Sequence, residues 1–498
     1  MTDGAADAMT LEILNHSFAY ECECILRLFF PGENIAVKQA PVCSGDRIVT
    51  EITGNEEGNT LMVRAVLGDF DKTATQDIPP EQPEKEQERL LCVLLFELLC
   101  EQTGKYPPWG ILTGVRPVRY CHIWREEGID DEGILDAFAG HFGVLPSKAR
   151  LALETAAVER KILRKNRTNG FSLYVSIPFC PSRCLYCSFV SHDIKGMKKL
   201  LPDYIMLLNE EIRNIGATAK DCGLVLQTIY IGGGTPTTLE VEQLEKILAT
   251  IRDNFDFSDL MEYTVEAGRP DTITAEKMAV LRSYGVNRLS INPQTMDDAV
   301  LKRIGRGHTA EDIVKAYDLA RKADFPIINA DLIAGLPGEL PEGFMKGLEQ
   351  IIRLGPENIT VHTLAIKRSS RLREEEGAFA DVNYDLSDLL DDAKCELTNS
   401  GYLPYYLYRQ KGTRQNLENV GYAKPGTESA YNVFIMEEVH NILAAGAGGV
   451  TKLCASDGRL KRIFNLKYPY EYISRHREML QRKTTQVVRG FLCDAGNY

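Results

Sequence analysis

Hydrophobic and polar residues follow two different patterns along this chain, and the pattern changes near residue 165. Between residues 171 and 362, short runs rich in β-branched and aromatic residues alternate with segments whose apolar residues recur every three or four positions. The short runs predict strands, and the segments between them predict helices. Strands that alternate with helices form a parallel sheet, so we expect an α/β fold with a partial (β/α)6 barrel over residues 166–370.

Six strands are predicted in this region: Ser172–Ile177, Thr228–Ile231, Glu262–Glu266, Arg288–Ile291, Ile327–Ile333 and Asn358–His362. The helices predicted between them are Asp203–Asn214, Leu239–Phe255, Ala275–Tyr284, Ala310–Ala323 and Pro341–Leu354. In barrels of this kind the chemistry gathers in the loops that follow the strands.

The first 165 residues predict an accessory α+β domain of their own. Its predicted strands and helices are Glu21–Phe29, Asp46–Thr53, Thr60–Leu67, Glu84–Thr103 and Ser147–Lys165, in chain order, the first three being strands. On a strand, Cys22 and Cys24 would share one face, so a metal pair is one interpretation and buried apolar thiols are the other.

A third part, residues 371–498, predicts a C-terminal α+β domain that covers the substrate. The sequence there favours a helix over Asp381–Ser400, an aromatic strand over Tyr402–Arg409 and a glycine-rich loop over Ala444–Gly449.

Composition and charge exclude several classes of partner. The net charge is −13 and no basic face dominates, which argues against nucleic-acid binding. The most apolar run, from Leu90 to Cys100, is about half a membrane span and contains Glu97, so no membrane span is expected. Residues 1–20 show no basic segment before an apolar one. A cytoplasmic location, where thiols stay reduced, is expected.

Three of the 13 cysteines have the spacing of metal ligands. Cys180, Cys184 and Cys187 form a C-x3-C-x2-C motif directly after the first predicted barrel strand. Three thiolates on one loop can hold a 4Fe–4S cluster and leave its fourth iron without a protein thiolate. A zinc site with His192 as the fourth ligand is the alternative.

Polar residues and glycines also follow the other predicted barrel strands. They are the run Gly232–Thr237, Glu266, Gln294, Arg306 and Asp331. Because the carboxyl ends of parallel strands meet at one mouth, these groups are expected to surround it.

The C-x3-C-x2-C motif, with Tyr186 before its third cysteine, resembles the radical S-adenosylmethionine (SAM) superfamily. In that superfamily the open iron binds SAM, and an electron from the cluster cleaves SAM to a 5′-deoxyadenosyl radical. Residues 171–450 further resemble the oxygen-independent coproporphyrinogen III oxidase (coproporphyrinogen dehydrogenase) family, through Y-x-S-I-P-F-C, G-G-G-T-P-T, S-I-x-x-Q, R-x-G-R-x-H and D-L-I-x-G-L-P. The long N-terminal extension and residues 405–422 resemble its HemZ-like branch.

This resemblance implies a cluster and one or two SAM molecules as cofactors. The positions that match SAM-binding residues are Tyr174, Gly233, Gly234, Thr235, Glu266, Gln294, Arg306 and Asp331, with Tyr186 at a second SAM, and Leu364 and the Gly446–Gly449 loop at the adenine.

The implied reaction is oxidative decarboxylation of two propionates of coproporphyrinogen III to vinyl groups, giving protoporphyrinogen IX. The implied partners are a tetrapyrrole, either coproporphyrinogen III or heme, and an electron donor such as flavodoxin or ferredoxin. Arg409, Lys411 and Arg414 are candidates to bind propionates, with a solvated loop as the alternative. Family oxidases carry a fourth cysteine where this chain has Phe189, and related heme chaperones share this C-x-F pattern. A heme-binding carrier is therefore the alternative function.

Overall fold

The computed structural model describes residues 9–42, 45–55, 58–112, 114–189, 191–367, 369–374, 384–410, 413–455 and 457–494. The chain packs as two compact units, one of residues 1–153 with 415–417 and the other of residues 154–414 with 418–498. The first boundary falls inside helix α5 (Pro146–Leu163), which belongs to both units. Residues 418–498 therefore pack with the barrel as one compact unit.

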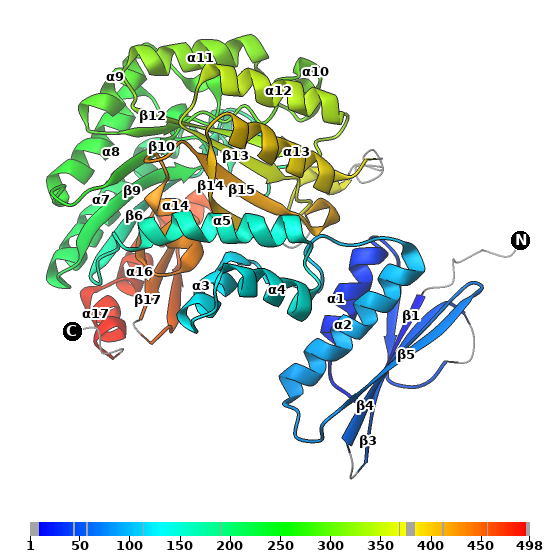
Figure 1. Cartoon of the computed structure of the whole chain (residues 1–498). Coiled ribbons are helices and arrows are strands. Elements are labelled where there is room, and N and C mark those ends of the chain that lie inside the picture. Colours follow the sequence, from blue (N-terminus) through cyan, green and yellow to red (C-terminus); the bar gives the residue numbers. More distant parts are fainter. Residues whose placement is uncertain are drawn as a thin grey trace, which may run out of the picture. The chain divides into compact units, whose positions relative to one another are not determined.

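In the N-terminal unit, a five-stranded sheet carries helices α1 (Ala19–Phe29) and α2 (Glu84–Thr103) against one face (Figure 1). Their apolar residues form one core with the sheet, in which Leu26, Leu61 and Leu95 are fully buried. The strand order is β2-β1-β3-β4-β5, with β1 (Met9–Leu14), β2 (Ile35–Lys38), β3 (Arg47–Asn55), β4 (Gly58–Leu67) and β5 (Phe70–Ile78). Helices α3 (Val118–Glu126) and α4 (Asp131–Phe142) follow.

The strand predicted at Glu21–Phe29 is wrong, because this segment is helix α1. Its buried residues Cys22, Leu26 and Phe29 recur at helical spacing, which the short run of cysteines and apolar residues conceals. Two residues apart on a helix, Cys22 and Cys24 point in different directions. Cys22 is a fully buried apolar thiol, and the proposed metal pair has no common face.

An eleven-stranded sheet forms the centre of the second unit. Six neighbouring parallel strands follow the chain order: β6 (Gly170–Ile177), β9 (Val225–Gly233), β10 (Glu262–Glu266), β11 (Arg288–Ser290), β12 (Ile327–Ala334) and β13 (Asn358–Thr363). Their outer face is covered by helices α7 (Leu201–Asp221), α8 (Val241–Asn254), α9 (Ala275–Ser283), α11 (Ala310–Lys322) and α12 (Pro341–Leu354) (Figure 1). The predicted α/β fold with a partial (β/α)6 barrel is confirmed.

The C-terminal segment extends the barrel sheet at both of its edges. Strands β14 (Leu403–Arg409) and β15 (Glu418–Ala423) continue it antiparallel beyond β13. Strand β16 (Asn441–Ala445) pairs parallel with β6, and β17 (Val450–Cys454) and β18 (Leu460–Phe464) follow antiparallel. The helices of this segment are α13 (Leu386–Asn399), α14 (Ala430–Glu437), α15 (Pro469–Ser474), α16 (His476–Arg482) and α17 (Thr485–Asp494). None of the helices in the described residues has the length and apolar character to cross a membrane.

Candidate functional site

One cavity of about 390 Å³ lies at the carboxyl ends of the barrel strands. The predicted cluster ligands and most of the residues matched to SAM binding line it: Tyr174, Cys180, Cys184, Tyr186, Cys187, Gly233, Gly234, Thr235, Glu266, Gln294, Arg306, Asp331 and Leu364. Strand register explains this convergence, since Glu266 pairs with Ser290 and Asp331 with Thr360 on the neighbouring strands.

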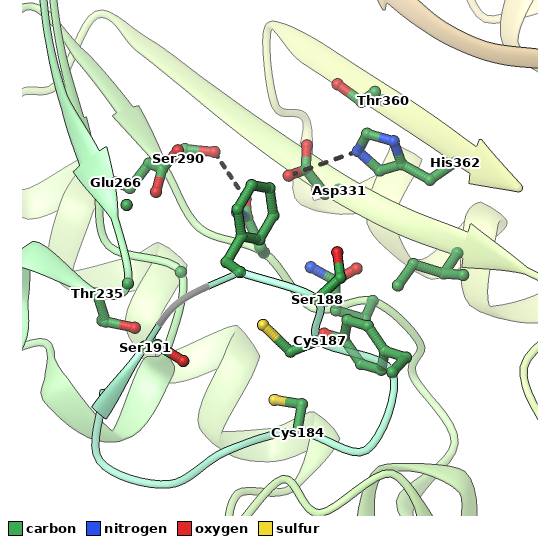
Figure 2. Close-up of a pocket in the computed structure, with 18 of the residues that line it drawn as sticks. Cys184, Cys187, Ser188, Ser191, Thr235, Glu266, Ser290, Asp331, Thr360 and His362 are labelled. Carbon is green, nitrogen blue, oxygen red and sulfur yellow. Dashed lines mark hydrogen bonds and ion pairs between the residues drawn. The ribbon is translucent and has the colours of Figure 1, made fainter. Parts of the chain in front are cut away.

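The three cysteines lie on one loop that begins in the short strand β7 (Phe179–Cys180) and ends before β8 (His192–Asp193). The loop is fixed to the barrel by a hydrogen bond from the Leu185 amide to the Ile304 carbonyl, at 3.0 Å. Figure 2 shows the sulfur atoms of Cys184 and Cys187 pointing to the same side of this loop. Burial raises the pKa of Cys180 and of Cys187, so a bound cation is needed to hold them as thiolates at neutral pH.

The spacing of these sulfur atoms does not match a single tetrahedral zinc ion. In a tetrahedral zinc site, with zinc–sulfur bonds of about 2.3 Å, the sulfur atoms lie about 3.8 Å apart. Within the part of the chain that the structure describes, the three cysteine sulfurs do not all lie within 4.8 Å of one another. His192, the fourth ligand of the zinc alternative, is not among the residues lining the cavity, and its ring packs edge-on against Tyr468.

A strip of glycines at the end of β9 supports the backbone that leads into Cys180. The Gly234 amide donates to the Ile177 carbonyl at 2.8 Å, and the Thr235 amide donates to the Phe179 carbonyl at 2.7 Å. A Cβ atom on Gly234 would lie 2.5 Å from the Phe179 oxygen. The Thr235 hydroxyl lies 3.5 Å from the Cys180 sulfur. Glycine is thus required here because two backbones meet directly beside the cysteine loop.

Two buried arginines face the cysteine loop from the barrel side. Arg306 donates to the Asn292 carbonyl at 2.5 Å and to the Tyr186 hydroxyl at 3.1 Å. Arg269, which the sequence argument did not single out as a site residue, donates to the Ser182 hydroxyl at 3.0 Å and lies 3.9 Å from the Cys184 sulfur. In the sequence, the position of Arg269 directly after the third predicted barrel strand is the feature that could have identified it as a site residue. These guanidinium groups place positive charge beside the thiols and beside the cavity.

Two acidic side chains that line the cavity, Glu266 and Asp331, differ in their protonation. Burial, and to a smaller extent the nearby Asp331, raise the pKa of Glu266 to about 7, although the Tyr230 hydroxyl donates to Glu266 at 2.7 Å and acts to lower this pKa. Burial also acts to raise the pKa of Asp331, but His362 and Asn329 outweigh it, and the net pKa of Asp331 is below its usual value. Asp331 is therefore a carboxylate at neutral pH, whereas Glu266 can exchange a proton near pH 7.

Gln294 has a backbone that glutamine rarely adopts, with φ at +72°. Hydrogen bonds from its amide to the Asp331 carbonyl and from the Ile333 amide to its own carbonyl impose this conformation. Its side-chain oxygen is buried and has no hydrogen-bond partner, and the same is true of the Nε atom of Arg306. A buried acceptor and a buried donor left unpaired at one cavity suit a ligand that carries both an ammonium and a carboxylate, as SAM does.

A wall of aromatic and amide side chains closes the cavity on the β13–β14 side. Tyr406, Tyr408 and Gln410 alternate along and just after β14 and line the cavity. His362 of β13 lies between two partners: its Nδ1 is 3.4 Å from the Tyr408 hydroxyl and its Nε2 is 3.8 Å from the Asp331 carboxylate, the pair joined in Figure 2. Lys367, which the sequence argument missed, also lines the cavity.

The cations expected to bind propionates do not line this cavity. Arg409 alternates with Tyr408 along β14, so its side chain is on the other face of the strand, where it is 4% exposed. Arg414 is also buried and is not among the residues that line the cavity, and Lys411 lies outside the described residues.

The Gly446–Gly449 loop also lies apart from the described residues that line the cavity. It packs beside the end of β6, where the Ser176 hydroxyl donates to the Ala447 carbonyl at 2.8 Å and the Gly446 amide donates to Glu211 at 2.7 Å. Of the two places matched to an adenine, Leu364 is the one at the cavity.

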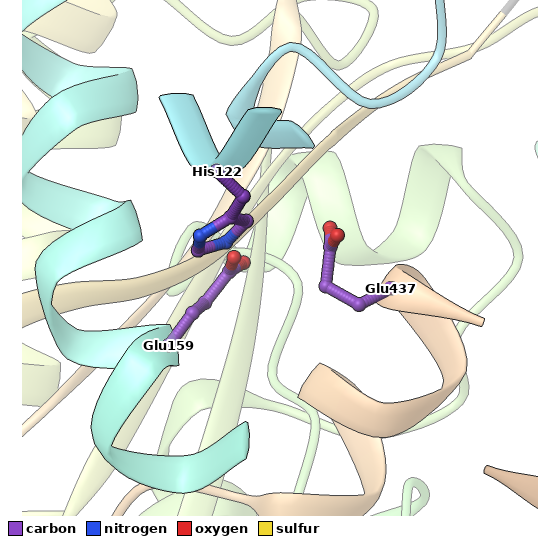
Figure 3. Close-up of side chains that lie close together, drawn as sticks. All are labelled: His122, Glu159 and Glu437. Carbon is purple, nitrogen blue, oxygen red and sulfur yellow. The ribbon is translucent and has the colours of Figure 1, made fainter. Parts of the chain in front are cut away.

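A further acidic pair of this unit, Glu159 of α5 and Glu437 at the end of α14, is drawn in Figure 3. Burial raises the pKa of Glu159 well above its usual value, and the charge of Glu437 raises it further. Neither residue lines the cavity.

Comparison with known proteins identifies the family. The sequence model of the radical SAM superfamily matches residues 174–351. The oxygen-independent coproporphyrinogen-III oxidase-like protein HemZ of Bacillus subtilis (strain 168) is 35% identical over 483 residues, which cover 95% of this chain and 94% of that protein. This chain belongs to the radical SAM family of oxygen-independent coproporphyrinogen III oxidase-like proteins. Members of this family use a 4Fe–4S cluster and SAM, as predicted from the sequence.

Relatives in this family carry two kinds of name. Heme chaperone HemW of Haemophilus influenzae is 32% identical over 61% of this chain and 75% of its own length. Oxygen-independent coproporphyrinogen III oxidase of Helicobacter pylori is 34% identical over 41% of this chain and 45% of its own length. The solved structure of coproporphyrinogen III oxidase (HemN) from Escherichia coli has a TM-score of 0.51 and 25% identity, covering 64% of this chain and 72% of that chain.

Proposed function

We propose that this protein is a radical SAM oxidoreductase that decarboxylates two propionate side chains of coproporphyrinogen III to vinyl groups, giving protoporphyrinogen IX. The observation that carries this proposal is the single cavity that joins the cysteine loop to the donor-rich wall of β13 and β14. A carboxylate-bearing side chain can therefore lie between the cofactors and hydrogen-bond donors within one enclosed space.

In this proposal Cys180, Cys184 and Cys187 hold the cluster. The unpaired Gln294 oxygen and Arg306 Nε bind the ammonium and the carboxylate of SAM, since each lacks a partner within the protein. When bound, the cluster and SAM would supply an adenosyl radical that takes a hydrogen atom from a propionate side chain, which would then lose CO2 and pass one electron to an external acceptor to leave a vinyl group. Excluding water from such chemistry is the role of the buried walls of the cavity.

The wall opposite the cysteines binds the substrate carboxylates. Lys367 supplies a cation, and the Tyr408 hydroxyl and the Gln410 amide supply neutral donors. Asp331 and Tyr408 hold the His362 ring in one orientation from its two nitrogens.

A heme-binding carrier is the second candidate, and Phe189 favours it. This side chain lines the cavity and is 69% exposed, at the position where the oxidases that the sequence resembles have a cysteine. A carrier that holds the heme iron through a histidine, however, needs a free ring nitrogen. His362 is the histidine among the described lining residues, and both of its ring nitrogens face partners. The oxidase is therefore the better supported function.

Product analysis separates the two functions. Anaerobic protein loaded with iron and sulfide is mixed with SAM, dithionite and coproporphyrinogen III, and the products are separated by chromatography with mass detection. The oxidase releases two CO2 and forms two vinyl groups per substrate. A carrier forms no product and instead gives a shifted Soret band when heme is added. If product still forms after His362→Gln and Lys367→Gln, this wall does not bind the substrate carboxylates, but the proposed reaction still stands.

A further inference from the structure

A basic surface lies beside the cysteine loop of this acidic protein. The whole chain has 70 acidic and 57 basic residues, yet residues 181–200 contain four basic residues and one acid. The basic residues are Arg183, Lys195, Lys198 and Lys199, and all are exposed. These four residues and the exposed Lys467 form a surface that we call the basic face.

The basic face adjoins the cluster ligands through the short β7–β8 pair. Asp193 of β8 is the register partner of Cys180, and neighbouring strands lie about 4.8 Å apart. Helix α6 (Ile194–Met197) begins at Asp193, whose carboxylate accepts a hydrogen bond from the Lys195 amide at 2.9 Å. Lys195 lies in α6, and Lys198 and Lys199 follow in the turn directly after it.

Arg183 and Lys467 complete this face. The Arg183 guanidinium donates to the Ser369 carbonyl at 2.7 Å, and the Ser369 hydroxyl donates to the Ser188 carbonyl at 3.1 Å, so Arg183 lies beside the cysteine loop. The His192 ring contacts the ring of Tyr468, with 5.9 Å between centroids, which places Lys467 beside β8. None of the five cations takes part in an ion pair within the described residues.

Exposed aromatic rings accompany these charges. Tyr468 and Tyr470 are stacked with 5.6 Å between centroids and are 38% and 53% exposed. Aromatic residues at the centre of a charged rim are typical of protein–protein interfaces. A rim of one sign selects a partner of the other sign and accelerates its encounter.

We propose that the basic face, together with Tyr468 and Tyr470, is the docking surface for an acidic one-electron carrier protein. This inference rests on the proposed function, because a cluster on the three cysteines must receive an electron from outside. The carrier loses one electron and the cluster gains it, and no bond forms or breaks. Docking here brings the carrier to the outer side of Cys180, opposite the substrate cavity.

The test compares two triple variants with the same change of charge. Lys195→Glu/Lys198→Glu/Lys199→Glu alters the basic face, whereas Lys246→Glu/Lys322→Glu/Lys346→Glu alters exposed lysines on α8, α11 and α12. Reduced flavodoxin, an acidic flavin protein, is the probe. Anaerobic stopped-flow absorbance follows reduction of the cluster in the loaded full chain, and calorimetry measures flavodoxin binding to the cluster-free full chain.

The basic-face variant should lower the rate of reduction by flavodoxin about tenfold or more at low salt. This difference should shrink near 1 M salt, where the Debye length is about 3 Å. Dithionite is small and needs no docking, so its rate should be the same in all three proteins. If charge reversal lowers the melting temperature, Lys195→Gln/Lys198→Gln/Lys199→Gln replaces it.

Equal rates for the two triple variants would overturn the proposal. The proposal would also be overturned if RNA or anionic vesicles bound saturably and this binding depended on the three lysines, while flavodoxin binding did not depend on them. Failure of the cluster to assemble would refute the proposed function, whereas binding to the cluster-free chain still reports on docking.

Discussion

Substitution of Gly234 by alanine tests whether the glycine strip sets the position of the cysteine loop. The added Cβ atom would lie 2.5 Å from the Phe179 oxygen and 2.9 Å from the Phe179 carbonyl carbon and amide nitrogen. All three are backbone atoms of the residue that precedes Cys180, so no flexible side chain can move aside. An ordinary contact begins at 3.4 Å, so the Phe179 oxygen must retreat by about 0.9 Å.

This displacement has two measurable consequences. Overpacking of this kind costs about 1–3 kcal/mol of folding free energy. A shift of about 1 Å in a reacting group can lower a rate about 100-fold. We therefore expect Gly234→Ala to fold with a lower free energy of unfolding, to bind less iron per chain and to cleave SAM at least tenfold more slowly.

Denaturant unfolding, iron content and anaerobic formation of 5′-deoxyadenosine measure these effects. Gly307→Ala is the matched control, since Gly307 lies beside Arg306 but has nothing within 4 Å of an added Cβ atom. Iron content and SAM cleavage within twofold of the parent protein in Gly234→Ala would refute the reasoning, because the loop would then tolerate the displacement.

Three other substitutions test the remaining parts of the site. Cys184→Ala should remove the brown cluster absorbance and SAM cleavage together, and cleavage that survives would exclude the cysteine loop as the cluster site. Arg306→Ala should weaken SAM binding about tenfold or more in calorimetry while the iron content is kept, and Arg306→Lys should restore only part of it because one ammonium cannot replace the planar guanidinium. Folding raises the pKa of Glu266 to about 7 from 4.5, so the native state holds a proton that the unfolded chain releases, and stability falls as the pH rises from 4.5 through 7. Glu266→Gln should remove up to about 3 kcal/mol of this decline in denaturant titrations of the cluster-free chain between pH 5 and pH 8, and an unchanged decline would contradict the raised pKa.

Local sequence patterns determined the barrel and its chemistry. Strand Glu262–Glu266 and helix Pro341–Leu354 have the bounds that their hydrophobic pattern predicts, because each period depends only on residues close in the chain. The cysteine spacing and the polar residue at each strand end are also local, and a parallel barrel brings all strand ends to one mouth whatever the details of packing. These features made the three cysteines and the polar strand-end residues predictable, whereas Tyr174, Tyr186 and Leu364 were implied by the family resemblance.

Only the tertiary structure decided which distant segments meet. Helix α1 replaces a predicted strand because its buried face is set by packing against the sheet and α2. The C-terminal strands β14 and β16 lie on opposite sides of the six barrel strands in one sheet. This placement depends on pairing with β15 and β6, which the residues of β14 and β16 do not themselves reveal. The same long-range pairing turns Tyr408 toward His362 and Arg409 away from the cavity, because side chains alternate across a strand and register alone fixes which face is inside.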